Sequence, residues 1–109
     1  MIYFKIFDKW ERTITAHTDN WGHATEGHPE LIDHEGAVMT TMVTPTHLLQ
    51  SDTAQTTKLY VGPVIEKGIF AGAHPISVVR YGTGNTGVWL TGYFDNSVPS
   101  LKVLWSEEK

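Results

Sequence analysis

The second half of the chain is divided into apolar–polar alternating segments by clusters of turn residues. Residues 88–94 alternate most clearly, and the turns 82–87 and 95–97 flank them. Residues 57–61, 76–81 and 101–105 are the other segments that the pattern predicts as strands. Short connections between successive strands favour antiparallel pairing. The pattern therefore predicts an antiparallel meander with residues 88–94 as a central strand.

The first half of the chain predicts a β-hairpin followed by helices. Residues 2–7 and 13–16 are the expected hairpin strands, and a helix capped by Thr18 or Asp19 should end at Pro29. Asp33 should cap a second helix, which Thr44-Pro45 ends, and Leu48 and Leu49 follow in a short third helical turn. The apolar side chains expected on the second helix are Val38, Met39, Met42 and Val43. The predicted fold class is α+β, with Trp21 and Met42 packed under residues 88–94.

Length and composition limit the classes of protein that the chain can belong to. A chain of 109 residues is expected to form a single domain, residues 1–109. It has no cysteine, no secretory leader pattern and no apolar run near the ~20 residues that span a bilayer, so we expect a cytoplasmic protein with no membrane partner. The net charge of −4 argues against broad nucleic-acid binding, and no DNA sequence readout is expected. A small local basic site remains open.

Residues 21–31 place two histidines and two carboxylates in one short segment. Imidazoles titrate near neutral pH, so His23, His28 and Glu30 are candidates for general acid–base catalysis. The alternative is structural: His23 as a half-buried helix residue, His28 as a cap before proline and Glu30 as a solvated charge. His34 and Glu35 add potential metal ligands, yet no recognised metal-binding spacing is present, so no metal is predicted.

Candidate phosphate-binding residues lie on the predicted strands and their connections. Lys58 and Tyr60 should share one strand face, and Trp89, Thr91 and Tyr93 should share another. Together with Arg80 and Ser51, these side chains suit a phosphate and a stacked base. The alternative is a solvated Lys58 beside an ordinary aromatic core. Gly82, Gly84 and Gly87 match a dinucleotide fingerprint, but no helix follows them; we interpret them as a turn and predict no cofactor.

The order of several short motifs resembles the phage-associated barnase/EndoU/colicin/RelE-like (BECR-fold) nucleases. The resemblance runs from about Arg12 to Trp105. The motifs that carry it are Trp21-x-His23, His28-Pro29-Glu30-Leu31, Thr44-Pro45, Ser51, Lys58-x-Tyr60, Val78-Val79, Val88-x-x-Thr91-x-Tyr93 and Leu104-Trp105. It implies a barnase-like fold, with N-terminal helices on a roughly four-stranded antiparallel sheet, and metal-independent RNA cleavage. Ala24 and Gly27 depart from the family pattern, which usually has a larger aliphatic residue and a cation there.

The resemblance makes a ribonuclease or RNA-directed toxin the leading functional expectation. The ribose 2′-hydroxyl would attack the adjacent phosphorus and leave a 2′,3′-cyclic phosphate. The expected catalytic residues are His23, His28, Glu30 and Thr91, and the expected phosphate-binding residues are Ser51, Lys58, Tyr60 and Arg80. Gly27 and the acidic balance favour the alternative, a catalytically silent protein-binding or phage accessory module. The expected partners are accordingly an RNA substrate, or an inhibitor or phage protein.

Overall fold

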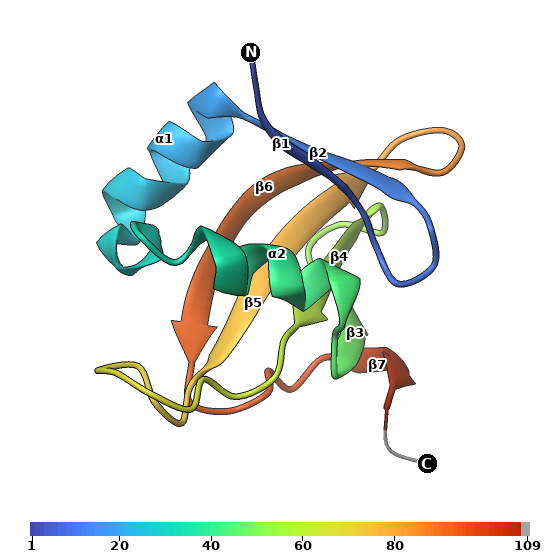
Figure 1. Cartoon of the computed structure of the whole chain (residues 1–109). Helices are drawn as coiled ribbons and strands as arrows, with labels where there is room; N and C mark the ends of the chain where they lie inside the picture. Colours follow the sequence, from blue (N-terminus) through green and yellow to red (C-terminus); the bar gives the residue numbers. More distant parts are fainter. Residues whose placement is uncertain (108–109) are drawn as a thin grey trace.

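The computed structural model, which describes residues 1–107, is built on one curled seven-stranded sheet with two short helices on one face (Figure 1). The strand order across the sheet is β1-β2-β6-β5-β4-β3-β7. In chain order the elements are β1 (Ile2–Phe7), β2 (Thr13–His17), α1 (Thr18–Gly27), the 3₁₀ turn η1 (Pro29–Leu31), α2 (Glu35–Val43), β3 (His47–Gln50), β4 (Thr57–Val61), β5 (His74–Tyr81), β6 (Thr86–Asp95) and β7 (Lys102–Ser106).

The predicted barnase-like layout, helices on a roughly four-stranded antiparallel sheet, is wrong. The sheet has seven strands and is mixed, because β2 runs parallel to β6. Strand β7 pairs with β3 and not with β6, so the second half is not a simple meander. The third helical turn is also wrong: Leu48 and Leu49 belong to β3, which pairs with β4 on one side and with β7 on the other.

Several local predictions are confirmed. Strand β4 has the predicted bounds, and β5 pairs with β6 in the antiparallel sense. Strand β6 lies inside the sheet, between β2 and β5. Helix α1 ends at Gly27, two residues before Pro29. The predicted caps are wrong: none of Thr18, Asp19 and Asp33 is an N-cap, because the N-caps are His17 for α1 and His34 for α2.

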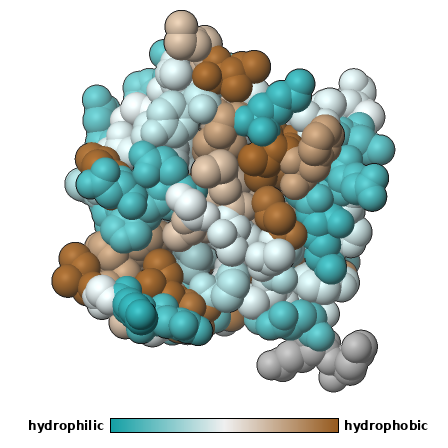
Figure 2. All heavy atoms as spheres, viewed as in Figure 1, coloured by the Kyte–Doolittle hydropathy of each residue, from teal (hydrophilic) through white to brown (hydrophobic). Residues whose placement is uncertain are grey.

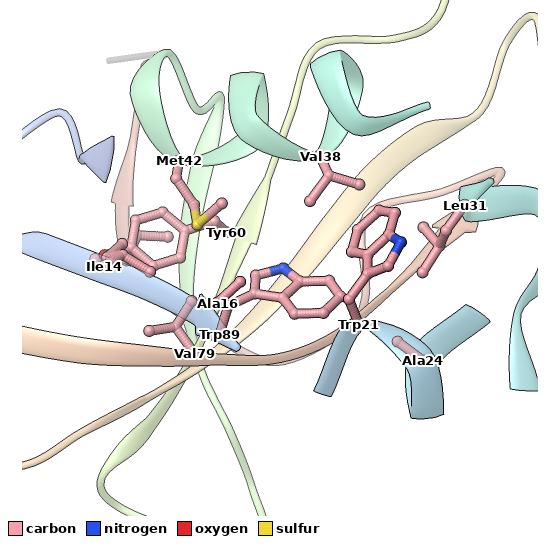
Figure 3. Packing of buried hydrophobic residues seen from close by; sticks show 11 residues of the cluster. Ile14, Ala16, Trp21, Ala24, Leu31, Val38, Met42, Tyr60, Val79 and Trp89 are labelled. Carbon is pink, nitrogen blue, oxygen red and sulfur yellow. The ribbon is translucent and has the colours of Figure 1, made fainter. Parts of the chain in front are cut away.

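The main core lies between the helices and the sheet and is centred on Trp89. Figure 3 shows the fully buried Trp89 with Trp21 and Leu31 on one side and Tyr60 and Ile14 on the other. The rings of Trp21 and Trp89 are 5.4 Å apart between centroids, so the predicted packing of Trp21 under β6 is confirmed. The indole N–H of Trp89 donates to Ser77 Oγ at 3.1 Å, which satisfies its one polar atom. The other face of the sheet holds a smaller cluster that includes Leu49, Leu59, Val61 and Ile76.

A β-bulge in β6 changes which side chains share a face. Val79 lies opposite Trp89 and Val78 lies opposite Thr91, so Leu90 is an additional residue on β6. Trp89 therefore points to the helix layer, whereas Thr91 and Tyr93 point to the other face. The prediction that these three side chains share one face is wrong, because simple alternation does not account for the extra residue.

Candidate functional site

An open groove lies where the two ends of the curled sheet meet. The turn that joins β1 to β2 contacts β7, and the rings of Trp10 and Trp105 meet edge to face with 5.3 Å between centroids. Trp10, Arg12, Leu48, Asn85, Leu104 and Trp105 line a cavity of about 470 Å³, which we call the hairpin groove. Figure 1 shows the hairpin turn and β7 on the same side of the molecule, although their strands lie at opposite ends of the strand order.

A buried carboxylate holds the hairpin turn in place. The Asp8 side chain is fully buried and accepts four hydrogen bonds. The backbone N–H groups of Trp10 and Arg12 donate at 2.9 and 2.8 Å, Arg12 Nε donates at 2.9 Å, and the Tyr60 hydroxyl donates at 2.6 Å. Because Tyr60 lies on β4, the network ties the turn to the middle of the sheet. It fixes one wall of the groove.

Cations lie over the aromatic rings in and beside the groove. The Arg12 guanidinium carbon is 5.1 Å from the centroid of the Trp10 ring and 4.8 Å from that of Tyr81. Lys9 Nζ is 5.0 Å from the centroid of Trp105. These distances are typical of cation–π contacts. The groove therefore combines flat aromatic surfaces with positive charge.

Strand register arranges the floor beside the groove in two parallel rows. Leu48 pairs with Tyr60 on β4 and with Trp105 on β7, which gives an apolar and aromatic row across three strands. Gln50 pairs with Lys58 and Lys102 on the same strands, which gives a second row with a lysine at each end. Directly paired residues share a face and two residues span about 7 Å of strand, so a cationic row runs parallel to the aromatic one.

Tyr81 adds a neutral hydroxyl below the hairpin turn. Its hydroxyl lies against that of Tyr60, and Lys58 Nζ is 5.3 Å from its ring centroid. Burial raises the pKa of Tyr81, an effect that Arg12 opposes and Asp8 reinforces. The phenol therefore remains protonated at neutral pH, and it serves as a hydrogen-bonding group and not as an anion.

The structure brings His28 and Glu30 together, away from the groove. His28 Nδ1 is 3.3 Å from a Glu30 carboxylate oxygen, and its ring lies 5.9 Å from that of Tyr93 between centroids. Burial, with Asp95 nearby, raises the pKa of Tyr93. His23 is apart from this pair: its side chain is 83% exposed, and its Nδ1 is 4.0 Å from Glu26.

The predicted phosphate-binding residues do not converge on His28. Lys58 contacts Tyr81, which pairs with Gly87 at the start of β6, whereas His28 contacts Tyr93 near the end of the same strand. Six residues of strand separate these positions, so the imidazole and the ammonium lie on the order of 20 Å apart.

The remaining predicted residues lie elsewhere. Arg80 and Thr91 are on the face of the sheet opposite Trp89, and Ser51 bonds with Thr53 in the loop after β3. Lys58 and Tyr60 share the helix-covered face, as predicted. The catalytic and phosphate-binding roles themselves stay predictions.

Two further kinds of feature are absent from the described residues. Within residues 1–107, no three histidine, aspartate or glutamate side chains gather to hold a metal ion. In the same part of the chain, no helix has the length and apolar character needed to cross a membrane.

The sequence did not predict the groove residues Trp10, Arg12 and Asn85 as functional residues. The available signal was an aromatic residue between charged ones in the expected hairpin turn, Lys9-Trp10-Glu11-Arg12. Strand alternation predicts which neighbouring residues share a face, and it gives no packing partner for a tryptophan in a turn. Its partner, Trp105, lies 95 residues later in the chain, and only the closure of the sheet brings them together.

Comparison with known proteins identifies no relative. No protein-family model matches the chain, and neither does any curated protein or solved structure. The resemblance to the phage-associated nucleases therefore stays a prediction from the sequence. The chemistry of the hairpin groove is the basis for assigning a function.

Proposed function

We propose that this protein binds single-stranded RNA in the hairpin groove. The observation that carries the proposal is the meeting of Trp10 and Trp105 in one open groove with Arg12 and Lys9 over their rings. Single-stranded nucleic acids are bound by aromatic side chains that stack on bases and by cations that neutralise the backbone. Trp10, Trp105 and Arg12 line the cavity, and Lys9 lies over the Trp105 ring.

The size and local charge of the groove support this class of ligand. A volume of about 470 Å³ falls in the range of small-molecule sites and suits one nucleotide better than a folded partner. Charges beyond about 8 Å are screened at physiological salt, so the net charge of −4 acts weakly on a phosphate held beside Lys9 and Arg12. Because Arg12 is already paired with the buried Asp8, one phosphate neutralised in the groove predicts a log–log salt slope of about −0.7.

The groove supports binding and not cleavage. None of its six lining residues is a histidine, an aspartate or a glutamate. Asp8 is fully buried beneath it and is occupied by four donors. The acid–base pair His28–Glu30 lies elsewhere on the molecule, so RNA cleavage is a separate prediction attached to that pair.

Calorimetric titration with a short oligouridine RNA tests the proposal. Replacing Trp105 by alanine removes one stacking surface, which should weaken binding by about ten- to a hundredfold. Val103→Ala is the matched control, because Val103 is an exposed β7 residue outside the lining of the groove. It should bind as the wild type does.

Two results would refute the proposal. One is the absence of saturable binding to any single-stranded RNA, which would favour the alternative of a protein-binding module. The other is equal loss of affinity in both variants, which would place the RNA away from the groove. Circular dichroism of each variant verifies that the fold is retained.

A further inference from the structure

We infer that the hairpin groove holds the terminal nucleotide of an RNA strand, with a phosphate on one side and a free hydroxyl on the other. The inference rests on the proposed function and adds the kind of RNA that the groove selects. It comes from the order of charges along β7 and from the size of the groove.

The charge changes sign along β7 on either side of the aromatic platform. Lys102 precedes Trp105, and its row ends in a second lysine, Lys58, on β4. Glu107 follows Trp105 by two residues and is exposed. Its backbone N–H donates to the carbonyl of Thr46 at 2.9 Å, which fixes it beside the start of β3. A nucleotide at Trp105 therefore has two lysines toward one side and a carboxylate toward the other, with Lys9 over the ring itself.

This order distinguishes a terminal nucleotide from an internal one. An internal nucleotide carries a phosphate on each side of its ribose, so one phosphate would lie toward Glu107. Like charges in such proximity repel each other, and repulsion here should weaken binding by about tenfold. A terminal hydroxyl can instead donate a hydrogen bond to the carboxylate, which accepts such bonds at both oxygens.

The dimensions of the groove agree with one bound nucleotide. Its volume is about 470 Å³, near the lower end of the range for small-molecule sites. Only four residues separate Lys102, the first residue of β7, from Glu107, which directly follows the strand. Over this described stretch, from residue 102 to residue 107, the cations form no continuous track for a long internal segment.

The test compares linear and circular oligouridine of the same length by calorimetry. A circle contains the same bases and phosphates without an end, so it should bind about tenfold more weakly than the linear strand. Two further linear strands, one phosphorylated at the 3′ end and one at the 5′ end, identify which end is held. Only the strand that is phosphorylated at the end held in the groove should bind as weakly as the circle does.

Glu107→Gln tests the role of the carboxylate. In this variant the affinities for circular and linear RNA should approach each other. Glu66→Gln is the control, because Glu66 is exposed in the β4–β5 loop, and it should keep the wild-type difference between the two affinities. Equal binding of linear and circular RNA by the wild type, with the Trp105→Ala loss intact, would overturn this inference and leave the proposed function standing. Absence of binding to both RNAs would remove the proposed function and this inference with it.

Discussion

Removal of the Asp8 carboxylate should be the most damaging single change in the hairpin. The Asp8 side chain is fully buried, and Arg12, with 21% side-chain exposure, is largely buried with it. Asp8→Ala leaves the guanidinium without its counter-charge, and it leaves two backbone N–H groups and the Tyr60 hydroxyl without their acceptor. Removing one partner of a buried ion pair costs about 3–5 kcal/mol, and the partial exposure of Arg12 favours the lower value.

That loss is a large part of the stability of a small domain, which is about 5–15 kcal/mol. At about 4–8 °C per kcal/mol, Asp8→Ala should lower the Tm by at least about 12 °C. Thermal and urea unfolding measure the change, with Asp52→Ala, an exposed position, as a control expected within about ±0.5 kcal/mol.

Tyr60→Phe removes one of the four donors to Asp8 and should cost about 1 kcal/mol. The double variant should be less destabilised than the sum of the two single changes, because the two residues share one network. A loss below about 1 kcal/mol for Asp8→Ala would refute the view that this network holds the hairpin wall.

Three other changes test separate parts of the molecule. Gly92→Ala places a Cβ 2.9 Å from a β5 carbonyl oxygen and should destabilise by about 1–3 kcal/mol, whereas Gly22→Ala, with nothing within 4 Å, should stabilise α1 by about 0.5–1 kcal/mol; urea unfolding of both variants measures this. Stability should fall as the pH rises above about 10, because the unfolded chain ionises Tyr81 while its raised pKa keeps it protonated in the folded state; Tyr81→Phe should flatten that dependence, and an unchanged pH slope would contradict the assignment. If the chain also cleaves RNA, cleavage should persist in EDTA and disappear in His28→Ala, whereas cleavage that needs added divalent metal would exclude the expected mechanism.

Strands with local signals were the predictable part of the fold. Residues 57–61 and 88–94 have the residue pattern of strands and are flanked by turn residues. The structure has β4 and β6 at these positions. The segment 47–50 is short and apolar at its centre, and it follows closely after Thr44-Pro45. This pattern fits a helical turn as well as a buried strand. Only pairing on both sides, with β4 and β7, determines that β3 is a strand.

Long-range pairing and irregularities could not be predicted from the pattern. The parallel contact of β2 with β6 joins segments about 70 residues apart, and nothing in either segment specifies the partner. The rule that side chains alternate between the two faces of a strand does not predict the bulge at Leu90. Because of this bulge, Thr91 lies on the face opposite Trp89. The groove forms only where the two ends of the sheet meet, and its residues come from distant segments of the chain. No local sequence pattern therefore identifies them as one site.

The four tryptophans provide the most direct measurement of where RNA binds. Trp10 and Trp105 line the hairpin groove, whereas Trp21 and Trp89 are buried in the main core. Titration of ¹⁵N-labelled protein with short oligouridine RNA should shift or broaden the indole N–H signals of Trp10 and Trp105 and leave those of Trp21 and Trp89 in place. Binding that leaves the Trp10 and Trp105 signals unchanged would contradict RNA recognition in the groove.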